Sequence, residues 1–465
     1  MTKIKFGTDG WRAIIADDYT VDNVQRVAEG TALWMEQREM RQVVIGYDCR
    51  FGGRLFAEAS ARVFGAYKIK VFLSHKFAST PMVSLGVVRT KSDIGVVITA
   101  SHNPPSYNGF KLKSSYGGPT IPDDIAAVEN LIPLKPLQHL PDIATLRIDG
   151  LLEEIDLEQM YLDHVIASFD LDAIKQSGLK IAFDAMYGAG QDILPRILPD
   201  AELLHCDFNP SFKGQAPEPI LRNLGELAAR MKSRGDLALG LANDGDADRI
   251  GLFDEEGNFV DSHHILLLLL FYLHKYKSMK GKVVFTFSVT DKMQRMAEKY
   301  GLEFEVTKIG FKYIAEIMTK EDILVGGEES GGLAVKGHIP ERDGIWIGLV
   351  ILEFMAKSGK SLRELIEMVY AEVGPFVCDR DDLHITNAQK ESVIAGCLEN
   401  KWAAFGPYPV RGRETLDGYK YILSDNAWVM IRPSGTEPVL RVYVQAPDQA
   451  EARLILDATR NTILK

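Results

Sequence analysis

The sequence predicts an α/β protein in which three similar mixed-sheet α/β domains and a smaller C-terminal α+β domain surround a central cleft. The chain has 465 residues, whereas a single hydrophobic core stops growing at roughly 250–300 residues. A strand followed by a polar loop recurs three times before Glu372, and the pattern of apolar residues changes after it. Length, repeat and change of pattern together predict four domains.

Each repeat contains two strand candidates. The first follows a basic residue: RQVVIGYDCR from Arg41, LKIAFDAMYG from Leu179 and GKVVFTFSVT from Gly281. The second opens on Asp and runs into a polar or glycine-rich loop: DIGVVITASHNP from Asp93, DLALGLANDGDADR from Asp236 and DILVGGEESGG from Asp322. Uninterrupted Val, Ile and Leu runs suit strands that are buried on both faces, with helices as crossovers. Because ligands bind at the carboxyl ends of such strands, the three loops predict one shared cleft.

The repeats predict domains at 1–150, 151–260, 261–371 and 372–465, which contain the first, second and third loops and a fourth loop respectively. In the last domain, VCDRDDLHI alternates polar and apolar residues as a strand does, and helical sequence follows from Asn387. Two strands around WVMIRPSGTEPVLRVYVQA precede a final helix, and Asp425-Asn426 predicts a hairpin turn.

Composition excludes several classes of protein. Hydrophobic residues at 46% and charged residues at 25% are typical of a globular chain. A net charge of −11 disfavours nucleic acid and anionic membranes as partners. The longest apolar run, Ile265–Leu273, is shorter than the roughly 20 residues of a membrane span and predicts a buried helix. The cysteines form no CxxC pair, which favours a reducing, cytoplasmic location: Cys49, Cys206, Cys378 and Cys397. None of these features sets the oligomeric state.

The loop Asn243–Arg249 predicts a metal site. Asp244, Asp246 and Asp248 alternate directly after a buried strand, and Gly245 lets the backbone curl so that the three carboxylates converge. Mg²⁺ suits these oxygen ligands and keeps positions open for phosphate oxygens. The alternative is a solvated acidic turn. A calcium EF-hand does not fit, because its twelfth position lacks Glu.

The loop Thr99–Pro105 carries a candidate nucleophile, Ser101, beside His102. Serine is a weak nucleophile until a base or a metal activates it. No GxSxG surrounds this serine, so an α/β-hydrolase elbow is not indicated. Taken alone, the loop is more typical of a turn with a capping serine than of a nucleophile. Lys111 is close enough in sequence to reach the same cleft.

Two further loops suit a phosphorylated sugar. Gly326–Gly332 offers carboxylates and a hydroxyl to sugar hydroxyls, although it could be a glycine-rich turn with solvated glutamates. Arg432–Pro438 combines a guanidinium, two hydroxyls and exposed amides, groups that wrap a phosphate, and Arg441 is a further candidate. This segment could otherwise be a plain connection between strands.

Together the loops resemble the α-D-phosphohexomutase superfamily. Four motifs occur in the order of that family: TASHNP around Ser101, DGDADR at Asp244–Arg249, GEESG at Gly327–Gly331 and RPSGTEP at Arg432–Pro438. FGTDGWR at Phe6–Arg12 is similar to the N-terminal signature of the family, so the resemblance covers the whole chain. It implies a phosphohexomutase that interconverts hexose 1-phosphate and hexose 6-phosphate through a phosphoserine and a hexose 1,6-bisphosphate.

The resemblance also implies roles for single residues. Ser101 would be the phosphoserine, and a phosphoserine oxygen would bind Mg²⁺ together with Asp244, Asp246 and Asp248. The sugar hydroxyls would be held by Glu328 and Ser330, and the non-reacting phosphate by Arg432, Ser434, Gly435, Thr436 and Arg441. Arg12, Lys111 and Arg249 would line the reacting end. The candidates for the general base are Lys111, His102 and His338, and glucose 1,6-bisphosphate would be the activator.

Within the superfamily, the TASHNP and GEESG forms favour glucose phosphates over glucosamine phosphates. Phosphomannomutase and phosphoglucosamine mutase are the alternatives, and Gly332 stands where some bifunctional members carry a histidine. A metal-dependent sugar phosphatase is an alternative of a different class, since it too would use aspartates and Mg²⁺ but would release free phosphate. The third alternative is a non-catalytic protein that binds sugar phosphates.

Overall fold

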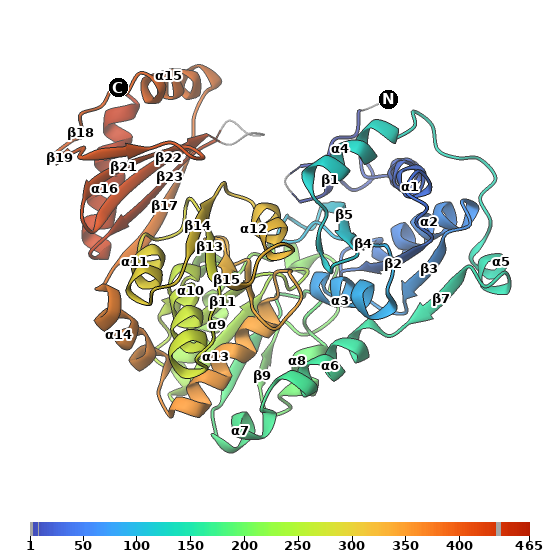
Figure 1. The fold of residues 1–465 in the computed structure, drawn as a ribbon, viewed down its shortest axis with the longest axis horizontal. Coiled ribbons are helices and arrows are strands. Elements are labelled where there is room, and N and C mark those ends of the chain that lie inside the picture. The colour runs from blue at the N-terminus through green and yellow to red at the C-terminus, as the bar shows by residue number, and fades with distance from the viewer. Residues whose placement is uncertain (1–2, 8, 434–438) are drawn as a thin grey trace. The chain divides into compact units, whose positions relative to one another are not determined.

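The computed structural model describes residues 3–7, 9–433 and 439–465. The chain divides into two compact units. Unit 1 comprises Met1–Val283 and Gly310–Ile366, and unit 2 comprises Val284–Ile309 and Glu367–Lys465. Figure 1 names the helices and strands of both.

The first sheet of unit 1 is mixed. Its order is β1-β5-β4-β2-β3-β7, with β6 paired to β5. The strands are β1 (Trp11–Ile14), β2 (Gln42–Tyr47), β3 (Lys70–Ser74), β4 (Ile94–Ile98), β5 (Tyr107–Ser114), β6 (Gly118–Pro119) and β7 (Leu152–Ile155). β4, β2, β3 and β7 run parallel, whereas β5 pairs antiparallel with β4 and β1. The strand that follows the serine loop therefore turns back, which brings Lys111 beside that loop.

Helices cover both faces of this sheet (Figure 1). They are α1 (Val21–Glu36), α2 (Gly53–Ala66), α3 (Thr80–Thr90), α4 (Pro122–Leu131) and α5 (Ile143–Ile148). α1 and α2 share a core with Val43, Ile45 and other residues of one face. α3 packs on β2 and β4 and begins at the Ser79 cap, whose side chain accepts from the Met82 N–H. The N-terminus of α3 thus lies at the sheet edge where the strands end.

The second sheet of unit 1 has the order β12-β11-β10-β8-β9. The strands are β8 (Ile181–Asp184), β9 (Glu202–Leu204), β10 (Leu239–Asn243), β11 (Ile250–Phe253) and β12 (Phe259–Val260). The surrounding helices are α6 (Leu157–Ser168), α7 (Leu171–Gln176), α8 (Ile193–Ile197) and α9 (Gly225–Arg234), with short turns at Phe212–Gly214 and Leu221–Asn223. β10 and β11 form an antiparallel pair, and residues 244–249 are the loop that joins them.

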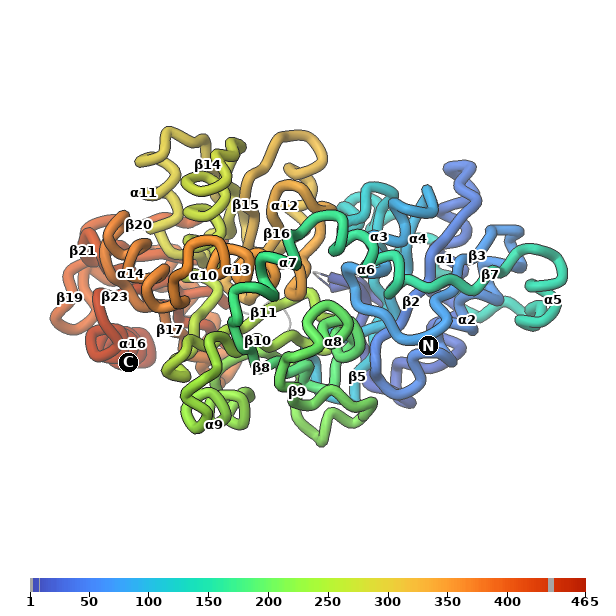
Figure 2. The backbone as a smooth tube through the Cα atoms, turned by 90° about the horizontal axis from the view of Figure 1, so that it is seen from below, coloured from blue at the N-terminus to red at the C-terminus, as the bar shows by residue number. Residues whose placement is uncertain are grey.

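The rest of unit 1 combines helices with an antiparallel pair of strands. It contains α10 (Ser262–Phe271), a π-helical turn (Tyr272–Tyr276), α12 (Phe311–Met318), β15 (Ile323–Gly327), β16 (Leu333–Val335) and α13 (Gly344–Ser358). The apolar run Ile265–Leu273 is buried in α10 and the turn after it, as predicted. α7 packs on α13, a neighbour distant in sequence (Figure 2). Across the described ranges, no helix has both the length and the apolar character that a membrane crossing requires.

The chain passes between the units three times: within β13 (Lys282–Thr286), between Ile309 and Gly310, and within α14 (Leu362–Val373). Unit 2 further contains α11 (Lys292–Lys299), β14 (Phe304–Thr307), β17 (Val377–His384), α15 (Asn387–Leu398), β18 (Ala404–Phe405), β19 (Tyr408–Pro409), β20 (Gly412–Glu414), β21 (Tyr419–Ser424), β22 (Ala427–Pro433), β23 (Val439–Ala446) and α16 (Gln449–Ile463). Its antiparallel sheet has the order β17-β23-β22-β21-β20, and α16 packs on one face (Figure 1).

Two local predictions for unit 2 are confirmed. α15 begins at Asn387, and a capping box between Thr386 and Gln389 explains its start. Asp425 and Asn426 form the turn between β21 and β22, where Ser424 pairs with Ala427.

Candidate active site and metal centre

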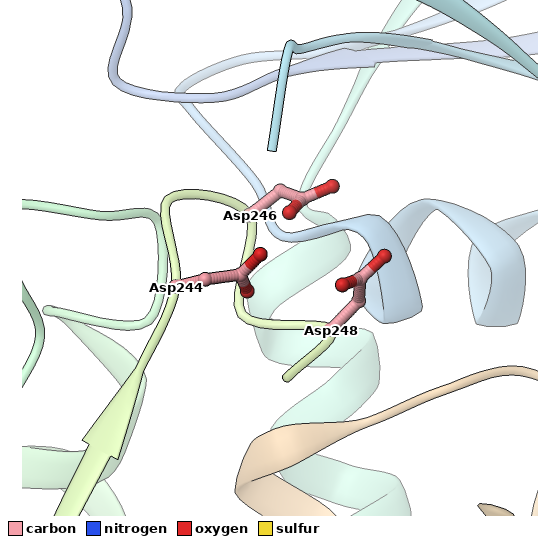
Figure 3. Close-up of side chains that lie close together, drawn as sticks. All are labelled: Asp244, Asp246 and Asp248. Carbon is pink, nitrogen blue, oxygen red and sulfur yellow. The ribbon is translucent and has the colours of Figure 1, made fainter. Parts of the chain in front are cut away.

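The three aspartates of the β10–β11 loop converge. One carboxylate oxygen from each of Asp244, Asp246 and Asp248 lies within 4.8 Å of the others, and all three residues are buried (Figure 3). Ala247 adopts a positive φ of 55° between the last two, which closes the loop. Burial, and then the charges of Asp246 and Asp248, raise the pKa of Asp244 well above its usual range. Three carboxylates so close together call for a cation.

In both Asp246 and Asp248, one carboxylate oxygen has polar partners and the other has none among the described residues. Asp246 Oδ2 accepts from Thr80 Oγ1 at 2.6 Å and from Lys111 Nζ at 2.8 Å. Asp248 Oδ2 lies 3.2 Å from Lys111 Nζ and 2.7 Å from Arg342 Nη2. The Oδ1 atoms of both residues are buried and have no hydrogen-bond partner among the residues described. Oriented oxygens with unused lone pairs fit a hard divalent cation such as Mg²⁺.

Ser101 meets this cluster from the loop after β4. Its Oγ donates to Asp244 Oδ2 at 2.7 Å, and the residue is only 1% exposed. Its φ is 52°, in the left-handed region that serine seldom adopts. A Cβ on Gly245 would lie 2.5 Å from the Ser101 carbonyl oxygen, so the close approach of the two loops requires glycine there. The predicted nucleophile and the predicted metal ligands are thus brought together.

Lys111 lies inside a cage of carboxylates. Besides its two contacts above, its Nζ lies 2.9 Å from Asp9 Oδ2. Burial would lower the pKa of Lys111, but Asp246, Asp248 and Asp9 raise it above its ordinary value. Burial would likewise raise the pKa of Asp9, yet Lys111 and Arg342 hold it well below its usual range. Without a metal on these aspartates, the three carboxylates favour the protonated ammonium of Lys111.

Arg12, His102 and Arg249 line the same region. Arg12 Nη1 donates to Asn103 Oδ1 at 2.6 Å, and burial lowers its pKa. Arg249 Nε lies 4.0 Å from one oxygen each of Asp244 and Asp248. Burial, and then the charges of Arg249 and Arg12, lower the pKa of His102 well below its usual range. His102 is a neutral imidazole, and its buried Nδ1 lacks a hydrogen-bond partner within the described ranges.

The predicted sugar loop is joined to the metal loop. Ile250 N donates to Gly331 O at 3.2 Å, and Arg249 pairs with Gly332 in an isolated β-bridge. Burial raises the pKa of Glu328 to about 7, although the charge of Arg342 opposes the shift. Ser330 is half-buried in the turn beside it. Glu328 can therefore be protonated or ionised at neutral pH.

His338 contacts Trp346, Asp343 and His164 rather than the carboxylates of this cluster, and its candidacy as a base stays a prediction. Its ring stacks on Trp346 with centroids 3.8 Å apart, and its Nε2 lies 2.9 Å from Asp343 Oδ2. Its Nδ1 faces His164 Nε2 at 3.1 Å. Arg342, four residues further along the chain, contacts the carboxylates instead. Its Nη2 lies 2.6 Å from Asp9 Oδ2.

Three residues of the cluster were missed by sequence reasoning: Asp9, Thr80 and Arg342. Asp9 stands inside the signature Phe6–Arg12, and Arg342 follows the candidate base His338 by four residues, so the charges of Asp9 and Arg342 could have indicated them. Thr80 follows a helix cap and carries no signal of its own. Its role arises because the start of α3 meets the metal loop, where Thr80 N also donates to Asp246 O at 2.9 Å.

In unit 2 the predicted phosphate arginines lie side by side. Arg432 on β22 pairs in register with Arg441 on β23. Arg432 donates through Nε and Nη2 to the two carboxylate oxygens of Asp417, each at 3.3 Å. Arg441 Nε lies 3.9 Å from Asp382 Oδ1. The other predicted phosphate ligands lie outside the described residues: Ser434, Gly435 and Thr436.

Four domain profiles of one family match the chain. They are the phosphoglucomutase/phosphomannomutase alpha/beta/alpha domains I, II and III, at residues 3–136, 159–257 and 261–373, and the C-terminal domain of the same family at residues 389–462. The domain boundaries expected from the sequence stay a prediction.

Relatives extend over the whole chain. A phosphoglucomutase/phosphomannomutase of Thermococcus kodakarensis is 30% identical over 460 residues, covering 97% of this chain and 96% of that protein. A phosphoglucosamine mutase of Methanococcus vannielii is 30% identical over 476 residues, covering 99% of each. A crystal structure from Thermus thermophilus, of a protein assigned as a phosphomannomutase, has a TM-score of 0.88 and 32% identity and covers 100% of both chains.

The fold and these relatives define an isomerase of the phosphohexomutase class. The chain belongs to the phosphoglucomutase/phosphomannomutase family of the α-D-phosphohexomutase superfamily. The predicted family, enzyme class and fold class of three similar α/β domains with a smaller C-terminal domain are confirmed, and the central cleft stays a prediction. The relatives carry the names of different sugars, so the family does not by itself set the substrate of this chain.

Proposed function

We propose that this protein interconverts hexose 1-phosphate and hexose 6-phosphate, with glucose preferred, through a phosphoserine at Ser101 and a hexose 1,6-bisphosphate. One observation carries the proposal: Ser101 Oγ lies 2.7 Å from Asp244 Oδ2, at the edge of three buried carboxylates. A metal bound there would neutralise charge on the phosphoryl oxygens as they pass between serine and sugar. Asp244, Asp246 and Asp248 would hold it, together with a phosphoserine oxygen.

The chain's own cations would stabilise the moving phosphoryl group. Arg12 and Arg249 lie around the serine loop and the metal loop, and their guanidinium groups suit phosphate oxygens. Lys111 is held protonated by three carboxylates, so its charge is fixed before substrate arrives. Such preorganised charge costs no rearrangement during the reaction.

Among the three candidate bases, His102 is the best supported. The carboxylates around Lys111 favour its protonated form, and the ring of His338 is stacked on Trp346. His102 follows Ser101 directly, and its buried Nδ1 has no hydrogen-bond partner among the described residues, so it can accept a proton, although burial and the charges of Arg249 and Arg12 lower its pKa and weaken it as a base. We assign it to the sugar hydroxyl that attacks the phosphoserine.

Binding of the substrate would be shared between the two ends of the sugar. Glu328 and Ser330 would hold the sugar hydroxyls. The non-reacting phosphate would be bound by Arg432, Ser434, Gly435, Thr436 and Arg441. The cross-strand pair of Arg432 and Arg441 supports this, since two adjacent guanidinium groups suit one phosphate.

The preference for glucose rests on the TASHNP and GEESG forms of two loops. A relative named phosphoglucosamine mutase supports glucosamine phosphates as the second candidate. Side-by-side turnover of glucose, mannose and glucosamine 1-phosphates, with catalytic glucose 1,6-bisphosphate as activator and Mg²⁺ present, decides between them. A higher kcat/KM on glucosamine 1-phosphate than on glucose 1-phosphate would overturn the preference for glucose. Release of inorganic phosphate in place of hexose 6-phosphate would indicate a phosphatase.

The four cysteines are free, which supports a cytoplasmic location.

A further inference from the structure

Arg50 lies directly beneath the serine loop. It follows β2 and is 2% exposed. Its guanidinium donates to three backbone carbonyl oxygens of that loop and to one at the start of β5: Nη2 to Ser101 O at 2.5 Å and Asn103 O at 2.6 Å, and Nη1 to Pro104 O at 2.8 Å and Tyr107 O at 3.0 Å. The planar guanidinium of Arg50 holds its donors in fixed directions, so these hydrogen bonds fix the backbone conformation of the serine loop.

Asp48 and Thr99 complete the arrangement. Arg50 Nε lies 3.2 Å from Asp48 Oδ2, and both side chains are fully buried. The same Asp48 oxygen accepts from Thr99 Oγ1 at 2.5 Å, and Thr99 Oγ1 accepts in turn from Ser101 N at 2.9 Å. Ser101 is therefore held at its amide through Thr99 and at its carbonyl through Arg50. Asp48 joins the two sides and balances the charge of Arg50.

The backbone of Ser101 needs such support. A non-glycine residue in the left-handed region persists only where its surroundings determine it. This conformation directs Oγ at Asp244. We propose that Asp48, Arg50 and Thr99 form a clamp that positions the Ser101 hydroxyl for phosphoryl transfer. They are positioning residues, because the clamp reaches the reacting atom only through the backbone of Ser101.

The clamp rests on the proposed function, in which Ser101 first gives its phosphoryl group to the sugar and then takes one back from the bisphosphate. Both half-reactions need the same oxygen in the same place, although the sugar lies in opposite orientations. A loosened clamp should therefore slow both half-reactions by similar factors. It should leave the binding of hexose phosphate almost unchanged, since the clamp residues are buried beneath the loop.

Two variants test the clamp in the full chain. Arg50→Lys keeps the charge but loses the fork, and a small displacement of a reacting group lowers the rate by about 100-fold. Thr99→Val keeps the ion pair and removes the hydroxyl, so kcat should fall about tenfold and Thr99→Ser should restore it. Arg26→Lys is the matched control, because Arg26 is also buried and donates to the Pro133 carbonyl oxygen at 2.7 Å in a part of unit 1 that the site does not use.

The readouts are kcat and KM for glucose 1-phosphate, and time-resolved intact mass for the two half-reactions. Glucose 1,6-bisphosphate should phosphorylate each clamp variant slowly, and glucose 6-phosphate should dephosphorylate it slowly, while Arg26→Lys behaves as wild type in both. Unchanged kcat in Thr99→Val, or a defect in one half-reaction alone, would overturn the clamp even if Arg50→Lys fails to fold. Wild-type turnover in Ser101→Ala would instead overturn the proposed function.

Discussion

Lys111→Met tests whether the buried carboxylates share a cation site. Lys111 Nζ contacts Asp246 at 2.8 Å, Asp9 at 2.9 Å and Asp248 at 3.2 Å. Methionine has a similar length and no charge, so the substitution removes the ammonium without opening a large cavity. Three carboxylates then lose one common partner.

The expected cost follows from what remains. At an effective dielectric constant of about 20, each of these pairs is worth roughly 5–6 kcal/mol before desolvation is subtracted. Removing one partner of a buried ion pair costs about 3–5 kcal/mol in measured cases. Arg342 still contacts Asp9 and Asp248, so only Asp246 is left without a described cation at ion-pair distance. We expect a loss of about 3 kcal/mol in the free energy of unfolding without magnesium, and a much smaller loss in saturating magnesium chloride.

Urea unfolding of wild type and variant, with magnesium and with EDTA, measures both values. Lys113→Met is the control, because the buried pair of Lys113 Nζ with Glu341 Oε2 at 2.6 Å makes no ion pair with the three aspartates in the described structure. Its loss of stability should not respond to magnesium. An equal loss in Lys111→Met with and without magnesium would refute a cation site at the three aspartates.

Three further predictions address the reaction, the second unit and pH. Ser101→Ala should abolish mutase turnover while leaving the unfolding midpoint nearly unchanged, and more than a few per cent of wild-type kcat with added bisphosphate would contradict it. Arg432→Ala should raise KM for hexose 1-phosphate and hexose 6-phosphate by comparable factors and lower kcat less than Ser101→Ala does, whereas a defect in one direction would exclude a shared phosphate site. Burial raises the pKa of Glu328 from 4.5 to about 7, so ionisation destabilises the fold as pH rises through this window, by roughly 3 kcal/mol when complete. Glu328→Gln lacks this penalty. Its free energy of unfolding relative to wild type, measured with urea without metal, should rise between about pH 4.5 and 7 and then stay level. A difference that does not change with pH would refute the raised pKa of Glu328.

The sequence predicted the parts of the site that depend on local spacing. Alternate aspartates after a buried strand converge wherever the loop turns back, and Asp244, Asp246 and Asp248 do so. The link from Ser101 to Asp244 joins two loops at the carboxyl ends of strands in different sheets, which the repeat of strand and loop anticipated.

Contacts that depend on how helices and strands pack were beyond such reasoning. His338 was a plausible base by its segment, but Trp346 in the first turn of α13 draws its ring into an aromatic stack. Arg342, four residues after His338, points to the carboxylates instead. Thr80 contacts Asp246 only because α3 starts beside the metal loop, and nothing in the residues around Thr80 indicates that neighbour.

The space beside Gly332 links two distant positions of the chain. A Cβ on Gly332 would lie 2.5 Å from Arg342 Cδ and 3.1 Å from its Cγ, so the arginine stem already fills the volume that a side chain at 332 would need. A histidine at 332 therefore requires the Arg342 stem to move. Gly332→His alone should expel a guanidinium that faces Asp9 and Asp248.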